Sequence, residues 1–246
     1  MLNILRSNAT EPAAGFTEAG RRGGENNMRW LERHLSQSRS GVDLLLVGGR
    51  DAMAYRLRNA QAQVRHDLSP SHWSHVVLLE TPDTARLEAT AVCEISLQPA
   101  GGFGFLPPTN GVQRGTLGQY RSARVWPNIG ILHLPCDAAQ VWNALRDFEQ
   151  QRAVLDATEL IVIWLAFLWG AGRTGNPLLD ARGIPSAAMV ETVVGAAGYE
   201  LTPGLENRAS CPEAIWQAAK WWSAFYAEHD AGPPTGAWCV THRLGW

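Results

Sequence analysis

The chain has 246 residues, with 21 Lys and Arg against 23 Asp and Glu, and a formal net charge of −2 at pH 7. This near-neutral balance and a pI of about 6.4 provide no basic footprint for nucleic-acid phosphates, so we expect no nucleic-acid partner. The length is enough for one domain with a large core. We expect a loose N-terminal segment over 1–27, where periodicity is weak, and a single domain over 28–246.

The N-terminus lacks the long apolar run behind a basic start that marks a secretory signal peptide. We therefore expect a cytoplasmic protein, or one exported without a cleavable signal peptide. The longest apolar block, 160–171, has about 12 residues, well short of the roughly 20 that a membrane-spanning helix needs. It predicts a helix buried on all sides and no membrane span; a wall for an acyl-chain pocket is the alternative interpretation.

The N-terminal half is predicted to be rich in strands. An amphipathic pattern over 28–35 predicts a short helix first. Apolar or alternating runs between turn residues then predict strands over 43–47, 75–80, 85–90 and 129–134. The second and third of these form a hairpin around a short Thr-Pro-Asp-Thr turn.

The C-terminal half is predicted to be helical. Helical periodicity and capping residues predict helices over 137–152, 157–169 and 186–198, and a last helix that begins with the capping box Ser210–Glu213. Strands gathered in one half and helices in the other favour the α+β class. We expect an antiparallel sheet packed against several helices.

The candidate chemistry begins at the hairpin. His75 opens its strand, and Glu88 lies in the returning strand, so in a tight hairpin both side chains can point into one site. An imidazole beside a carboxylate is the base and its orienting group in hydrolytic triads. Glu94 is the alternative carboxylate, but on a continuous strand it would lie about 20 Å beyond Glu88 at about 3.3 Å per residue. Glu88 is therefore the predicted orienting group.

Two motifs with cofactor or metal chemistry are interpreted as coincidences. Segment 170–175 matches G-x-G-x-x-G, but it follows a predicted helix rather than a strand, so we expect no dinucleotide site. The pairs His133/Cys136 and Cys239/His242 could pool four zinc ligands, yet nothing in the sequence brings the pairs together. We expect reduced cysteines, no metal and no organic cofactor.

The order of several short segments resembles the circularly permuted, YiiX-like branch of the NlpC-type papain-like hydrolases. That branch has a Gly-Asp strand, a Ser-His-Val-Gly segment, a Glu-Ala strand, a Gly-Val…Leu…Tyr segment, and a Cys-Ser helix followed by Ala-Gly and a proline. The matching pieces here, within about 41–216, are Ser74-His75-Val76, Glu88-Ala89, Gly111-Val112…Leu117…Tyr120 and Ala197-Gly198…Pro203. The resemblance implies a permuted papain-like fold.

In that family the nucleophile is a cysteine at the beginning of a helix, where the helix dipole and a nearby histidine stabilise the thiolate. Counting back from Ala197 places the family's cysteine position at Ser186. Three interpretations of Ser186 stay open: a working nucleophile, an inactivated former cysteine, or a helix N-cap. Cys211 is the rival nucleophile at another predicted helix start. We interpret Cys211 as structural, because the Thr-Pro-Gly segment before it matches the segment that comes after the cysteine helix in the family.

The resemblance implies a hydrolase or acyltransferase that acts on an amide or ester bond through a covalent acyl intermediate. His75 is the expected base, Glu88 its orienting group, and Ser186 occupies the nucleophile position. Peptidoglycan peptides, other amides and lipid acyl groups are the substrates that fit the family. The alternative, from another functional class, is a catalytically degenerate binding module that keeps the cleft but lacks the thiol.

Overall fold

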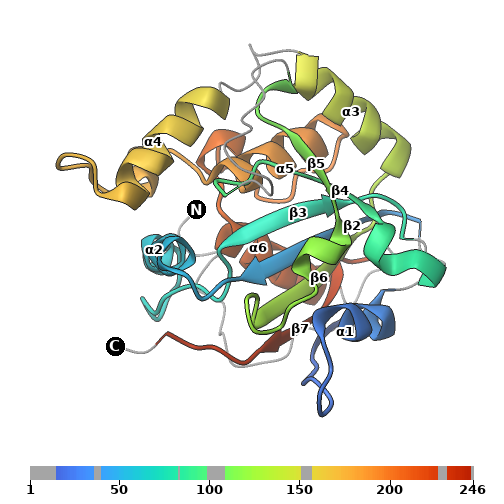
Figure 1. The fold of residues 1–246 in the computed structure, drawn as a ribbon. Coiled ribbons are helices and arrows are strands. Elements are labelled where there is room, and N and C mark those ends of the chain that lie inside the picture. Colours follow the sequence, from blue (N-terminus) through green and yellow to red (C-terminus); the bar gives the residue numbers. More distant parts are fainter. Residues whose placement is uncertain are drawn as a thin grey trace.

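The computed structural model describes residues 15–35, 40–82, 84–98, 109–150, 157–226 and 232–244. In these ranges the chain forms one seven-stranded mixed sheet with the order β1-β7-β6-β2-β3-β4-β5, accompanied by six α-helices (Figure 1). Strands β1 and β7 pair in parallel, and every other neighbouring pair is antiparallel. The predicted α+β class is confirmed, but the sheet that was expected to be antiparallel is mixed, because β1 joins it parallel to β7.

The strands are β1 (Phe16–Glu18), β2 (Val42–Gly48), β3 (His75–Leu79), β4 (Ala91–Glu94), β5 (Gln113–Thr116), β6 (Asn128–Leu134) and β7 (Thr235–Val240). The α-helices are α1 (Asn27–His34), α2 (Ala52–Ala60), α3 (Ala138–Gln150), α4 (Ala157–Trp169), α5 (Pro185–Ala196) and α6 (Pro212–Phe225). Short 3-10 segments are η2 (Ala62–Val64), η3 (Thr84–Ala89), η5 (Leu117–Tyr120), η6 (Pro177–Asp180) and η7 (Asn207–Ala209).

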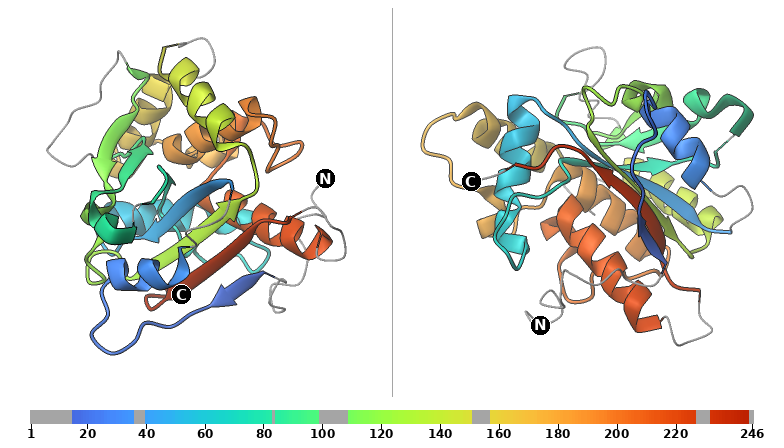
Figure 2. Two further views of the ribbon diagram at one scale, coloured as in Figure 1. Left: turned by 90° about the vertical axis from the view of Figure 1, so that its right-hand side faces the viewer. Right: turned by 90° about the horizontal axis from the view of Figure 1, so that it is seen from below.

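The central strands are buried on both faces, because helices cover one face and α1 with η3 and η5 covers the other (Figure 2). Side chains alternate along each strand, so one strand feeds two cores. The face towards α2 and α3–α6, here called the helix-covered face, carries Leu44, Leu46, Val76 and Leu78. The opposite face, here called the α1 face, carries Leu45, Val47, Val77 and Leu79.

Most of the predicted elements are present within a few residues of their expected bounds. The strand expected over 85–90 is wrong: this segment forms the 3-10 segment η3, and the returning strand is β4. The capping box at Ser210 is also wrong, because Cys211 is the N-cap of α6 and the Glu213 side chain instead binds Arg65 and Ser71.

Two further expectations concern burial and the chain ends. Helix α4 is not buried on all sides, since Val162 and Trp169 are exposed. Within the segment expected to be loose, residues 16–18 form β1 and pair with β7. No helix in the described ranges is long and apolar enough to span a bilayer.

Candidate functional site

His75 is held at the beginning of β3 by the two residues before it. Trp73 is fully buried against Trp216, and Gly130 makes room for its ring, because a Cβ there would lie 2.9 Å from the indole. The Ser74 hydroxyl accepts a hydrogen bond from the Gly49 N–H (3.1 Å) and donates one to the Val47 carbonyl (3.2 Å). These contacts fix the end of β2 against the beginning of β3, so the position of His75 follows from local packing.

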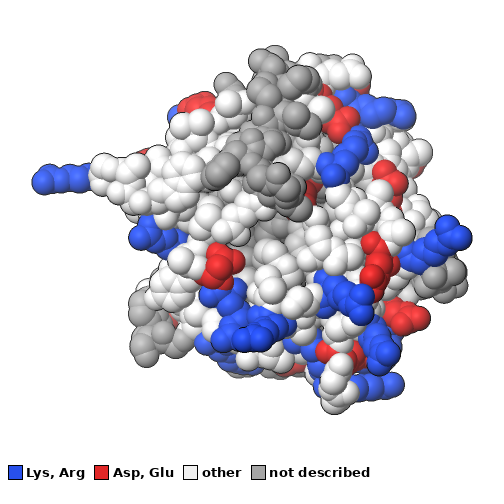
Figure 3. Space-filling view, viewed as in Figure 1, with Lys and Arg blue, Asp and Glu red and all other residues white. Residues whose placement is uncertain are grey.

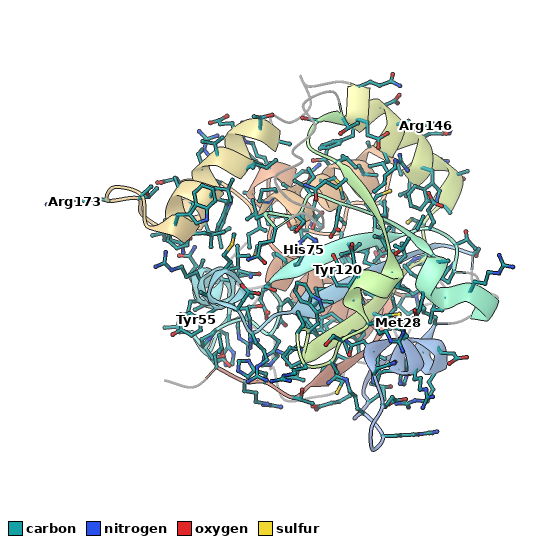
Figure 4. The ribbon with its side chains drawn as sticks, viewed as in Figure 1. Met28, Tyr55, His75, Tyr120, Arg146 and Arg173 are labelled. Atoms are coloured by element: carbon teal, nitrogen blue, oxygen red, sulfur yellow. The ribbon has the colours of Figure 1, made fainter. Side chains whose placement is uncertain are left out.

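The His75 imidazole binds a buried carboxylate, that of Glu94 at the end of β4. Its Nε2 lies 2.5 Å from Glu94 Oε2. Tyr120 donates its hydroxyl to the same oxygen, and Gln119 Nε2 donates to Oε1 at 2.7 Å. His75 and Tyr120 are neighbours (Figure 4), and their rings stack with centroids 6.5 Å apart. Glu94 is thus held by three donors from two separate parts of the chain.

The three donors set the ionisation of this carboxyl. Burial alone raises the pKa of Glu94, but the hydrogen bond from His75 and the charge interaction with it, together with the hydrogen bonds from Tyr120 and Gln119, outweigh burial, and the pKa is lowered from its ordinary 4.5. Burial and the Glu94 carboxylate raise the pKa of Tyr120 well above 10, so its hydroxyl stays a donor. An ionised carboxylate only accepts hydrogen bonds. The hydrogen between the pair therefore resides on Nε2, which leaves Nδ1 of a neutral His75 as a proton acceptor.

Glu88, the predicted orienting group, is not the partner of His75. It is exposed on η3, where it forms an ion pair with Arg121 at 3.2 Å. Glu88 lies away from His75 because the connection between β3 and β4 is longer than the expected tight turn. Leu78 pairs with Cys93 and Leu79 with Val92, and extending this register places Glu94 two residues from the position opposite His75. Such diagonal neighbours are within reach of long side chains.

His75 lines a small cavity next to the beginning of α5. The cavity has a volume of about 30 Å³, room for a water molecule or a small polar group, and its wall includes Met53, Leu57, Ile95, Trp126 and Ile184. Ile184 is the N-cap of α5, so this residue and His75 line the same cavity.

Ser186, the predicted nucleophile, lies in the first turn of α5 after Pro185. It is not the N-cap of α5, contrary to one of its three interpretations. Its side chain is fully buried, and among the described residues its hydroxyl has no hydrogen-bond partner, His75 included. Helix α5 packs on the helix-covered face, whereas the register of His75 with Val47 directs the imidazole to the α1 face. The structure brings the backbone of α5 close to His75 but leaves the two functional groups unbonded.

The rival nucleophile and the potential zinc ligands lie elsewhere. Cys211 is buried and lines a different cavity, and burial raises the pKa of its thiol to about 12, which disfavours the thiolate. His133 binds Asp43, and His242 contacts Arg58. Across the described ranges, no group of three or more His, Cys, Asp or Glu side chains is arranged to hold a metal ion.

Three further residues of the site were given no role by the sequence patterns. Gln119 and Tyr120 reach Glu94 from η5, and Trp126 lines the cavity and packs on Tyr120 with ring centroids 5.4 Å apart. Tyr120 belongs to the segment that carries the family resemblance, which was the one signal that pointed to it. Trp126 forms the aromatic wall of the cavity, and Trp73 is part of the core.

We expect replacement of Tyr120 by Phe to lower the free energy of unfolding at pH 7 by about 1.5–3 kcal/mol, the range for a hydrogen bond to a charged group. Because the folded-state pKa of Glu94 is below 4.5, its contribution is present above pH 4.5 and is lost as the pH falls through the folded-state value. The deficit should therefore shrink in acid. Urea unfolding of Tyr120→Phe at pH 7 and at low pH measures the deficit and its change with pH. Tyr55→Phe, on the surface, is the matched control. A deficit that is constant with pH would contradict the assigned charge of Glu94.

The chain matches no family model, no curated protein and no solved structure.

Proposed function

We propose that this protein is a hydrolase or acyltransferase that acts on an amide or ester bond, with His75 as general base, Glu94 as its orienting group and Ser186 as nucleophile. The observation that carries the proposal is the buried His75–Glu94 pair beside a cavity. Its carboxylate is fixed by two further donors, and one imidazole nitrogen is left to accept a proton. A positioned base of this kind is what acyl transfer through a hydroxyl requires.

The proposed reaction has two halves. His75 Nδ1 takes the proton of the Ser186 hydroxyl as Oγ attacks the carbonyl carbon, and N–H groups at the beginning of α5 stabilise the oxyanion. The amine or alcohol then leaves with the proton from His75, and the acyl group remains on Oγ. Water or another acceptor, deprotonated by His75, then attacks the acyl carbon, and His75 returns that proton to Oγ as the acyl–Oγ bond breaks. The first step requires the Ser186 side chain to turn from its buried position towards the cavity.

We also propose the permuted papain-like fold for this chain. The order of the resembling segments supports it, as does the meeting of His75 with the beginning of α5 at one cavity. Acidic and basic side chains are interspersed over the face seen in Figure 3, which fits a small-molecule, peptide or lipid substrate better than a polyanion. Peptide amides of peptidoglycan and lipid acyl esters are the substrate classes that we propose.

Hydrolysis of p-nitrophenyl esters and peptide anilides tests this proposal. We expect His75→Ala and Ser186→Ala to abolish turnover, and Glu94→Gln to lower kcat/KM about 10²–10⁴-fold, the usual range for general-base catalysis. Glu88→Gln is the matched control. It should leave kcat/KM unchanged, because the Glu88 carboxylate pairs with Arg121 and does not contact His75. Equal losses in Glu88→Gln and Glu94→Gln would refute the assignment of the orienting group.

A second candidate is the binding module that keeps the cleft without catalysis. The observation that favours it is the complete burial of the Ser186 hydroxyl with no hydrogen-bond partner among the described residues. In that case Ser186→Ala would change no activity, because none exists. Ser186→Cys would then restore a thiol at the family position, and an ester substrate that acylates only this variant would identify the chain as a degenerate relative.

A further inference from the structure

A second cavity, which shares no lining residue with the His75 cavity, opens between η2, η6 and the beginning of α6. Its volume is about 680 Å³, within the range of small-molecule sites. Most of its wall is apolar, including Val64, Leu68, Leu178, Leu205 and Ala214. A ligand that covered these aliphatic side chains would remove their apolar surface from water, which favours binding.

Two residues in this wall adopt an unfavourable backbone conformation. Leu68 and Ala181 both have φ of 55°, in the left-handed region where a side chain is disfavoured. Among the described residues, only Asn110 is a further non-glycine case, and its residue type tolerates this region better. The Leu68 side chain is in addition 60% exposed. Strained backbone and an exposed leucine at one cavity are both costly for the free protein, and such outliers concentrate at ligand sites.

The charged groups named at this cavity are all engaged in pairs. Arg65 is the cation in its wall, and its guanidinium is engaged by Asp67 (2.9 Å) and Glu213 (3.0 Å). No net positive charge is therefore available for an anionic head group, and the carboxylates are occupied by Arg65. Gln63 and the exposed His66 supply the remaining polar atoms of the wall.

We propose that this cavity binds the alkyl chain of an uncharged amphiphile, with the polar end of the ligand near Gln63 and His66. The chain would cover Leu68 and Leu205, which are exposed in the free protein, and so remove their apolar surface from water. The site is independent of the proposed acyl-transfer activity.

Calorimetric titration with n-octyl β-glucoside below its micelle concentration tests the proposal. We expect binding of octyl glucoside at least tenfold tighter than that of glucose, octanoate or octylamine. Leu205→Asp should weaken binding at least tenfold. Leu179→Asp is the matched control, because Leu179 is 72% exposed in the same region but does not line the cavity.

Leu68→Gly is a second test of the proposal, for the case in which Leu205→Asp fails to fold. Glycine accepts the left-handed conformation, so this variant should unfold at the same temperature as the wild type or higher, and yet bind octyl glucoside less tightly. The proposal is overturned if octyl glucoside binds no better than glucose. It is equally overturned if a charged alkyl probe binds as well, or if Leu205→Asp and Leu179→Asp have the same effect.

Discussion

Replacement of Arg58 by methionine should lower the free energy of unfolding by about 2–5 kcal/mol, because each buried acceptor left without a donor costs about 1–3 kcal/mol. Arg58 is fully buried on α2. Its guanidinium donates to the carbonyls of Ser71 (2.7 Å), Gly49 (3.4 Å) and His242 (2.9 Å), and contacts His242 Nδ1 (3.0 Å). Methionine fills much of the volume but leaves the carbonyls of Ser71 and Gly49 without this donor, whereas the His242 carbonyl keeps a hydrogen bond from Asn128 Nδ2 (2.9 Å).

Loss of Arg58 should also disturb the candidate site. Arg58 joins Gly49, after β2, to Ser71, before His75, and to His242, after β7. Denaturant unfolding at pH 7 measures the loss. Arg121→Met is the control, since the Arg121–Glu88 pair is exposed and such pairs contribute about 0–1 kcal/mol. If Arg58→Met costs no more than Arg121→Met, the network around Arg58 does not support the fold.

The second large effect should be a gain in stability at alkaline pH when Glu191 is replaced by glutamine. Glu191 is a buried residue of α5, and burial, with a smaller contribution from Glu200, raises the pKa of its carboxyl to about 7. Its hydrogen bond from the Ser210 hydroxyl is long, at 3.4 Å. No cation in the described part of the chain forms an ion pair with it.

The raised pKa of Glu191 determines how the stability of the fold changes with pH. The folded-state pKa lies above the ordinary 4.5, so protonated Glu191 stabilises the fold fully below pH 4.5, and this contribution is lost as the pH rises through about 7. The loss amounts to about 3 kcal/mol at about 1.36 kcal/mol per unit of pKa. Glu191→Gln should therefore be more stable than the wild type at pH 8 by up to about that amount, and nearly equal to it at pH 4. Thermal unfolding at both pH values, with exposed Glu206→Gln as control, decides the matter: a glutamine variant no more stable at pH 8 contradicts the raised pKa.

The sequence patterns predicted the strands of the site better than its side-chain partners. The apolar run after His75 can only be buried as a strand, and β3 begins at that residue. The alternation around Leu87 misled the prediction of the next strand, because a 3-10 segment that buries Leu87 between the exposed Arg86 and Glu88 produces the same short pattern. A longer connection then shifted the register, and Glu94 took the place expected for Glu88.

The remaining parts of the site depend on contacts between distant parts of the chain. Tyr120 reaches Glu94 across 26 residues, and nothing in the local sequence around either residue encodes this contact. Ser186 was placed by counting from a family pattern, which gives a position on a helix but not the direction of a side chain. Whether its hydroxyl reaches His75 depends on the packing of α5 against β3, which is set by the whole core.

In the proposed mechanism, His75 activates Ser186 by taking the proton of its hydroxyl. Intact-mass spectrometry after incubation with a fluorophosphonate, which esterifies a serine oxygen activated by a base, tests it most directly. We expect one adduct per chain, mapped to Ser186, absent from Ser186→Ala and formed at least about 100-fold more slowly in His75→Ala. An unlabelled wild-type protein, or labelling of Ser186 at the same rate without His75, would contradict the claim.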